Sequence, residues 1–142
     1  MIVPDLNLLI YAYDSTSPQH AKAKEWWVRS LSRNETVGIS WMVILGFIRI
    51  WTNPRVFANP MTVDQACAHV EKWFTRPMVK VLNPGPRHAE IVFRLLRDEG
   101  CGGNLTTDAH LAALATEFTA TLHSNDSDFL RFPGLKWLNP IA

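Results

Sequence analysis

The chain has 142 residues, of which 47% are hydrophobic and 19% are charged. This length and composition fit one folded domain with a proper core, and they exclude a disordered or highly solvated polypeptide. The formal net charge of +1 argues against a protein that coats nucleic acid through charge alone. A net charge near zero is compatible with a nuclease, because the charges of a local acidic site and of a basic rim can cancel in the net charge.

The sequence carries no sign of export or membrane insertion. No apolar run approaches the roughly 18 residues that a membrane-spanning helix needs, and no basic segment followed by a long apolar stretch opens the chain, so no signal peptide is visible. Cys67 and Cys101 stand alone, without a CxxC pattern, and are interpreted as reduced thiols. We therefore expect a cytoplasmic protein with no membrane association.

The first half of the chain alternates strand-like and helix-like segments. The predicted elements are, in order, a strand at 1–5, a helix at 6–13, a helix begun by Ser17-Pro18, a strand at 36–40, a strongly apolar helix at 41–51 and a helix at 62–74. Ser17 is expected as an N-cap with Pro18 in the first turn. Thr62 and Gln65 have the spacing of a capping box.

The second half continues the alternation. It predicts a strand at 79–82, a helix at 86–99 that Gly100 ends, a helix opened by 104–107 and running through Leu114, a strand at 119–123 and a last strand at 136–138. Strands and helices that alternate in this way predict a three-layer α/β/α fold, with a mainly parallel central sheet flanked by helices. We expect a single domain over residues 1–142.

Several aspartates fall where strands end or helices begin. Asp5 ends the first strand, Asp126 and Asp128 follow the strand at 119–123, and Asp108 comes just after the expected N-cap Thr107. In an open parallel sheet, ligands bind beyond the carboxyl ends of the strands. Carboxylates that converge there repel each other unless a cation neutralises them. Hard oxygen ligands favour Mg²⁺ or Mn²⁺ over zinc.

Each aspartate also has a structural explanation. Asp108 in a first helical turn is favourable with the helix dipole alone, and Asp126 and Asp128 suit a turn or a helix cap. Asp5 is harder to explain by structure alone, because it lies where a parallel sheet is buried on both faces.

Four blocks of sequence, in order along nearly the whole chain, carry a resemblance. They are 2–12 (IVPDLNLLIYA), 39–41 with 46–50 and 52–57, 107–115 (TDAHLAALA), and 124–129 with 132–135. Together they resemble the VapC family of PIN-domain toxins. The resemblance implies a PIN-like fold and Mg²⁺-dependent cleavage of structured RNA, such as a tRNA or an rRNA loop, with inhibition of translation and growth. It further implies a cognate VapB-type antitoxin and a homodimer.

The resemblance also implies roles for individual residues. Asp5, Asp108 and Asp126 would be the catalytic, metal-binding carboxylates, and Asp128 a further metal ligand. Asn7 and Ser124 would support them by coordination or hydrogen bonding.

One position departs from the family pattern. Many PIN domains have a glutamate in the second block where this chain has Gly46. Three explanations stay open: water fills the gap, an acid such as Asp128 compensates, or the chain is an inactive descendant. Because Mg²⁺ often keeps several waters, weakened or altered metal binding is favoured over inactivity.

Other features separate the alternatives. Asn7 stands where aspartate-nucleophile phosphatases need a second aspartate, which argues against that class. A catalytically silent PIN domain that binds RNA or an antitoxin is the surviving alternative. The five histidines show no nuclease-like pairing, and His110 lies two residues from Asp108 on another helix face.

Exposed basic and aromatic residues suggest contacts with partners. Arg49 and Arg55, which flank Trp51 and Asn53 at the end of the apolar helix, are predicted to bind RNA phosphates, although solvated surface arginines are equally common. The aromatic residues of Trp26-Trp27 and of 41–51 predict an apolar groove for an amphipathic antitoxin helix, although most tryptophans of the chain are expected in the core or in an interface.

Overall fold

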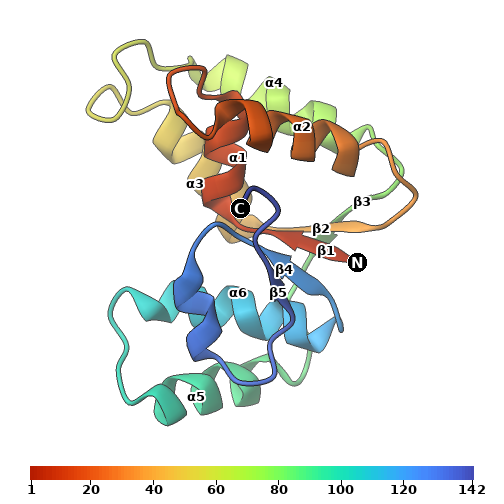
Figure 1. The fold of residues 1–142 in the computed structure, drawn as a ribbon, viewed down its shortest axis with the longest axis vertical. Coiled ribbons are helices and arrows are strands. Elements are labelled where there is room, and N and C mark those ends of the chain that lie inside the picture. Colours follow the sequence, from red (N-terminus) through yellow and green to blue (C-terminus); the bar gives the residue numbers. More distant parts are fainter.

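The computed structural model describes residues 1–142 and contains a five-stranded sheet in the order β3-β2-β1-β4-β5, with every pairing parallel (Figure 1). The strands are β1 (Ile2–Pro4), β2 (Val37–Ser40), β3 (Val79–Leu82), β4 (Thr121–His123) and β5 (Trp137–Leu138). The helices are α1 (Leu6–Tyr13), α2 (His20–Ser30), α3 (Trp41–Trp51), α4 (Val63–Phe74), α5 (His88–Glu99), α6 (Leu105–Glu117) and the 3₁₀ helix η1 (Ser127–Arg131). The predicted α/β class is confirmed.

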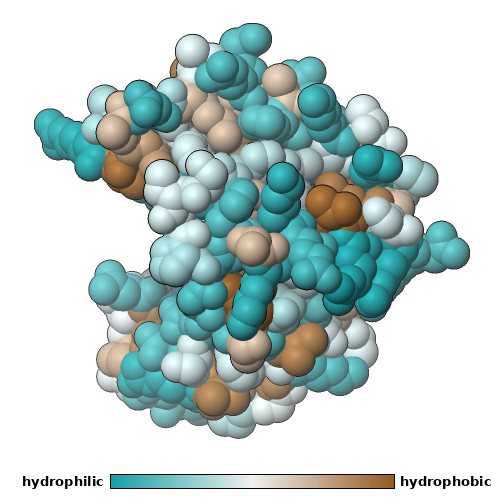
Figure 2. Space-filling view, turned by 45° about the horizontal axis from the view of Figure 1, so that its top comes forward, coloured by the Kyte–Doolittle hydropathy of each residue, from teal (hydrophilic) through white to brown (hydrophobic).

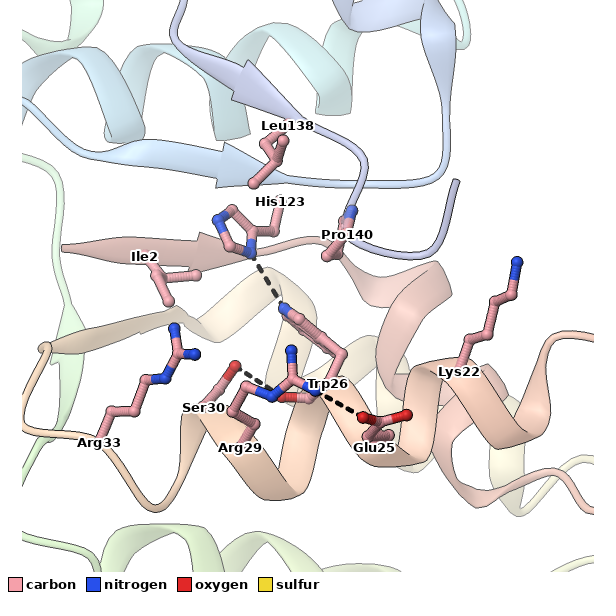
Figure 3. A pocket seen from close by; sticks show the side chains of 10 residues that line it. All are labelled: Ile2, Lys22, Glu25, Trp26, Arg29, Ser30, Arg33, His123, Leu138 and Pro140. Carbon is pink, nitrogen blue, oxygen red and sulfur yellow. Dashed lines mark hydrogen bonds and ion pairs between the residues drawn. The ribbon is translucent and has the colours of Figure 1, made fainter.

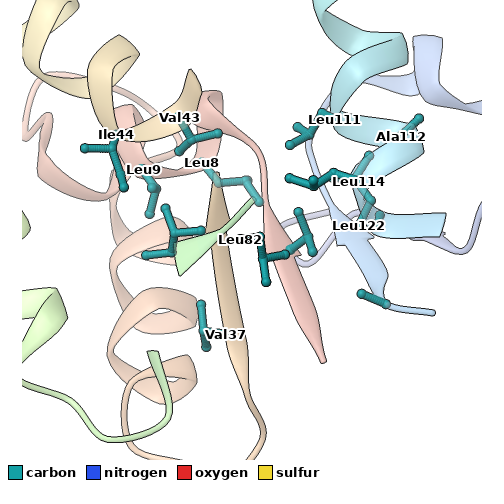
Figure 4. Close-up of a cluster of buried hydrophobic side chains, with 14 of the residues drawn as sticks. Leu8, Leu9, Val37, Val43, Ile44, Leu82, Leu111, Ala112, Leu114 and Leu122 are labelled. Atoms are coloured by element: carbon teal, nitrogen blue, oxygen red, sulfur yellow. The ribbon is translucent and has the colours of Figure 1, made fainter. Parts of the chain in front are cut away.

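The helices form two layers on opposite faces of the sheet. Helices α1 to α4 lie on one face, and α5 and α6 cover the other (Figure 1). Aliphatic side chains fill both interfaces, with Leu8 and Ile44 on the first side and Leu111 and Leu114 on the second (Figure 4). None of the helices is both long and apolar enough to cross a membrane.

Aromatic rings build the core of the larger layer. The Trp73 ring meets those of Phe47 and Trp27 edge-on, with centroids 4.8 and 5.5 Å apart, and the Trp73 indole donates to the Tyr13 hydroxyl over 2.8 Å. Edge-to-face contacts of this kind stabilise a core beyond the area that the rings bury. The α3–α4 pair is thereby fixed against α1 and α2.

Local signals set most helix boundaries. The Ser40 hydroxyl accepts from the Val43 amide over 3.1 Å, and Thr62 and Gln65 form both bonds of the predicted capping box. Three predicted starts were wrong, those of α2, α5 and α6. Helix α2 begins at His20, because Ser17 Oγ instead accepts from the Gln19 amide in a turn before the helix.

The start of α6 also differs from the prediction. Its N-cap is Asn104, so Thr107 lies inside the first turn and is not the cap. Asp108 still belongs to that turn. Helix α5 begins at His88, two residues after the predicted Pro86, and ends at Gly100 in a left-handed conformation with φ of 75°. A glycine adopts that conformation without steric cost.

The two edges of the sheet are short. Strand β3 spans four residues, with the exposed Lys80 in its middle. Strand β5 spans two residues, and Pro140 follows it closely.

Candidate active site

Asp5 lies where β1 passes into α1, and three hydrogen bonds hold it there. Its amide donates to the His123 carbonyl over 2.9 Å. Its Oδ1 accepts from the Leu6 amide at 2.7 Å, which caps α1. Its Oδ2 accepts from the Ser124 hydroxyl at 2.7 Å. The carboxylate is therefore fixed at the carboxyl end of the central strands.

Ser124 links this carboxylate to its neighbours. Its Oγ accepts from the Asp126 amide at 2.9 Å and from Asn7 Nδ2 at 3.4 Å, and its hydroxyl donates a hydrogen bond to Asp5. One buried hydroxyl thus ties three of the predicted site residues together. Asn7 Oδ1 is buried and has no hydrogen-bond partner.

Asp126 and Asp128 follow β4. Asp126 Oδ1 accepts from the Asp128 amide at 2.9 Å and caps the 3₁₀ helix η1. Asp126 therefore caps a helix, as its structural explanation predicted, and it also lies near Asp5. The other carboxylate oxygen of Asp126 makes no hydrogen bond within the protein.

Asp108 completes the group from α6. Burial, followed by repulsion from Asp5, Asp126 and Asp128, raises the pKa of Asp108 from 3.8 to about 6. Burial likewise raises the pKa of Asp5, with a smaller contribution from Asp126. Carboxyl groups on three separate segments therefore lie close enough to perturb one another's ionisation.

The donor chemistry fits a hard divalent cation. The converging side chains offer carboxylate and amide oxygens, and the unpartnered Asn7 Oδ1 adds another. As the side chains stand, no three acidic, histidine or cysteine groups lie close enough together to share one ion. Closing on a cation therefore requires side-chain adjustment, and metal ligation by these residues stays a prediction.

Comparison with known proteins supplies the family. The PIN-domain family model matches residues 2–135. Ribonuclease VapC33 of Mycobacterium tuberculosis is 43% identical over 141 residues, which cover 99% of each chain. Ribonuclease VapC37 of the same organism is 41% identical over 142 residues, 100% of this chain and 99% of that one. The chain belongs to the VapC ribonucleases of the PIN-domain family.

A solved structure of the family has the same fold. The structure of VapBC2 from Rickettsia felis, which is bound to a DNA fragment from the VapBC2 promoter, superposes with a TM-score of 0.71 at 20% identity, covering 98% of each chain. The predicted PIN-like three-layer fold is confirmed. In this VapC-family fold, the strands point toward a surface notch between the two helical layers (Figure 2).

Gly46, the departure from the family pattern, is buried on α3. A Cβ built on it would lie 2.6 Å from Leu6 Cδ2. The Leu6 side chain thus occupies the space that a longer residue would enter, directly beside Asp5 in the chain. Helices α1 and α3 therefore pack closely at Gly46, and α3 offers no acidic side chain at this position.

The predicted RNA contacts are placed on the surface. Arg49 and Arg55 are exposed, and neither forms an ion pair. Both guanidinium groups are free to meet phosphates, and that role stays a prediction.

The prediction of an aromatic groove was wrong for most of its residues. Trp26, Trp27 and Trp51 are 3–7% exposed and belong to the core, while Trp41 is 48% exposed. Hydrophobic atoms on the face shown in Figure 2 form separate small patches. A cavity of about 360 Å³ does remain between α1 and α2, where Trp27 meets the exposed Val28.

Sequence reasoning missed two histidine contacts. His88 Nε2 and His110 Nδ1 are 2.8 Å apart and join α5 to α6, although the histidines had shown no pairing in the sequence. His123 accepts from Trp26 through its ring and from Asp5 through its carbonyl. No signal in the sequence predicts either pair, because 22 and 97 residues separate the partners.

Proposed function

We propose that this VapC-family chain is a Mg²⁺-dependent endoribonuclease toxin, with Mn²⁺ as a possible substitute. Its substrate would be structured RNA, such as a tRNA or an rRNA loop, and cleavage would inhibit translation and growth. The observation that carries the proposal is the gathering of Asp5, Asp108, Asp126 and Asp128 at the carboxyl end of the sheet, where burial and mutual repulsion raise the pKa of Asp108 to about 6. Such repulsion disfavours the metal-free state and favours binding of a cation.

The residues of this site have separate tasks in the proposal. Asp5, Asp108 and Asp126 would hold the cation, with Asp128 beside them. When bound, the cation would supply an activated water and charge stabilisation for the leaving oxygen. Ser124 fixes the Asp5 carboxylate through its 2.7 Å hydrogen bond. With a pKa of about 6, Asp108 is mostly ionised at neutral pH and serves as a ligand there.

Cleavage by the purified chain tests the proposal. We expect tRNA or rRNA fragments to be cut in Mg²⁺ or Mn²⁺ and left intact in EDTA. Asp108→Asn keeps the side-chain shape and should lower the rate by about 10²–10³-fold, as loss of one strong electrostatic contact does. Asp98→Asn, on the exposed face of α5, is the matched control and should cleave normally. Cleavage that persists in EDTA or in Asp108→Asn would contradict the proposal.

The RNA target needs a separate experiment. Sequencing the RNA ends that arise when the chain is expressed in cells should show one dominant site in a loop. A random distribution of ends would argue against recognition of a structured RNA.

Gly46 favours a second candidate function. A PIN domain that has lost an acidic ligand could bind RNA or an antitoxin without cutting RNA. That candidate predicts saturable RNA binding with no cleavage in either metal, and the same purified protein distinguishes it.

The expected partner is a VapB-type antitoxin. The cavity between α1 and α2, with Trp27 at its floor and Val28 at its rim, suits one or two apolar side chains of a partner helix. An arginine from the partner would pair with the carboxylates of the candidate active site. Val28→Asp should then weaken the complex while leaving cleavage by the free chain intact, and size measurement would show whether the chain is a homodimer.

A further inference from the structure

A cavity of about 300 Å³ opens between α2 and the strands β1, β4 and β5 (Figure 3). The buried residues Trp26, Ser30 and His123 line its interior. Three exposed basic residues of α2 and the loop after it, Lys22, Arg29 and Arg33, form its rim. None of these residues belongs to the carboxylate site.

The hydrogen bond between Trp26 and His123 decides where the His123 ring carries its proton. Trp26 Nε1 is 3.0 Å from His123 Nδ1, and an indole nitrogen only donates. His123 Nδ1 must therefore accept and holds no proton. With Nδ1 occupied as an acceptor, the ring is neutral and its proton is on Nε2.

The Nε2–H group is consequently a donor in the cavity. The His123 ring makes no hydrogen bond apart from that with Trp26. Figure 3 shows the Nδ1 side of the ring facing Trp26 on α2, with Nε2 on the side of the ring toward Ile2. Ser30, on the opposite wall, donates its hydroxyl to the Trp26 carbonyl at 2.8 Å and makes no hydrogen bond with the His123 ring.

The rim adds positive charge that is only partly compensated. Arg29 pairs with Glu25 at 2.5 Å, and Glu25 is the one acidic residue that lines the cavity. Lys22 and Arg33 form no ion pair. In Figure 3 the Arg33 guanidinium points toward the strands near Ile2, while the Arg29 guanidinium lies over α2 beside Glu25. Donors therefore approach the cavity from both walls.

We propose that this cavity binds a phosphate group, with His123 Nε2–H and the Arg33 guanidinium as donors and Lys22 as a further positive charge. A tetrahedral anion presents oxygens in several directions and can accept from both walls at once. Arginine recognises phosphate through two parallel N–H donors. The phosphate can be free in solution or part of an RNA backbone. The second source is open because His123, which lines the cavity, directly precedes Ser124 of the candidate active site.

Titration with inorganic phosphate at constant ionic strength tests the site directly. We expect saturable binding that shifts the His123 Nε2–H resonance in NMR spectra. Arg33→Gln should weaken it about tenfold, the scale of one charged hydrogen bond, while Arg76→Gln, an exposed arginine after α4, should not. Lys22→Gln provides a second variant should Arg33→Gln misfold. The proposal is overturned if phosphate does not saturate, if Arg33→Gln and Lys22→Gln bind as the wild type does, or if Arg76→Gln loses as much.

Binding of a short oligoribonucleotide in EDTA distinguishes the two sources. Weaker RNA binding in Arg33→Gln, together with competition by inorganic phosphate, identifies a backbone phosphate as the occupant. Lost phosphate binding with unchanged RNA binding identifies free phosphate. The phosphate titration requires no RNA cleavage, so failure of the proposed nuclease activity leaves its result intact.

Discussion

The central strand pair β1–β4 separates two sites of opposite charge. Asp5, Asp108 and Asp126 gather at its carboxyl end, whereas Lys22 and Arg33 surround the cavity beside α2. Two consecutive residues serve the two sites, since His123 bonds Trp26 and Ser124 bonds Asp5. The net charge of +1 therefore conceals charges that the fold segregates.

Burial acts on both sites and drives both toward neutrality. It raises the pKa of Asp5 and Asp108 and lowers the pKa of His123. The response of each site differs. A hydrogen bond from Trp26 satisfies Nδ1 of the neutral His123 ring and leaves Nε2–H as a donor, while the carboxylates of the other site repel each other and, in the proposed function, would bind a cation. Burial therefore leaves a donor in one site and mutually repelling acceptors in the other.

Breaking the contact between Trp26 and His123 in the basic cavity should have the largest effect on stability. Trp26→Phe removes the donor to His123 Nδ1 and reduces the volume of a buried ring, so we expect a loss of about 2–3 kcal/mol. Urea unfolding measures it. Trp41→Phe, at the exposed Trp41, is the control and should cost less than about 0.5 kcal/mol. An equal loss in both variants would show that the Trp26 hydrogen bond contributes nothing.

Removing one charge from the carboxylate site should stabilise the metal-free protein. The raised pKa of Asp108 means that stability present below pH 4 is lost as the pH rises through about 6. Solvent screens this partly exposed carboxyl, so the loss is about 1–2 kcal/mol. Asp108→Asn should therefore melt above the wild type at pH 7.5 and level with it at pH 4.

The same melting curves include a metal test. Mg²⁺ or Mn²⁺ at millimolar concentration should raise the wild-type melting temperature and affect Asp108→Asn much less. A wild-type melting temperature that ignores both ions would remove the basis for a metal site.

Restoring the missing acid should sharpen the carboxylate site. Gly46→Glu places a carboxyl group beside Leu6, whose flexible side chain must turn away from the 2.6 Å approach. We expect Mn²⁺ to bind about tenfold more tightly, which is a change of about 1.4 kcal/mol. Gly46→Ala controls for the steric contact. Equal Mn²⁺ affinity in the two variants would mean that the new carboxyl does not reach the site.

Replacing a predicted RNA contact should have the smallest effect. Arg49→Gln and Arg55→Gln should each weaken RNA binding a few-fold, because both side chains are exposed, and should lower the salt dependence by about one phosphate contact. Fluorescence anisotropy in the Asp108→Asn background measures this. A loss of Mn²⁺ affinity in either variant would place the arginine at the metal site instead.

Periodicity and capping residues predicted much of this fold. The apolar run at 41–51 and the Thr62/Gln65 capping box define α3 and α4 as observed, because both signals are local. The start of α6 was misplaced, because Asn104 and Thr107 are both residue types that cap helices, and the observed cap Asn104 makes no side-chain capping hydrogen bond. Local composition alone does not decide between two neighbouring polar residues.

The site was only partly accessible from the sequence. Asp5 at a strand end and Asp126 after β4 follow from strand placement, and the structure brings both near Asp108. The packing of Leu6 against Gly46 and the Trp26–His123 bond depend on contacts between distant segments. The burial of Trp26 and Trp27 likewise required the positions of α2 and the sheet.

The short edges of the sheet limit how another polypeptide can attach. A peptide that adds as an extra strand needs a long row of free amide and carbonyl groups. Strand β5 offers two residues with Pro140 close behind, and β3 presents Lys80 at its middle. Exposed lysine, proline and short length are features that discourage strand addition and aggregation. A second copy or a protein partner is therefore expected to bind through the helices, and recruitment through backbone pairing at either edge is disfavoured.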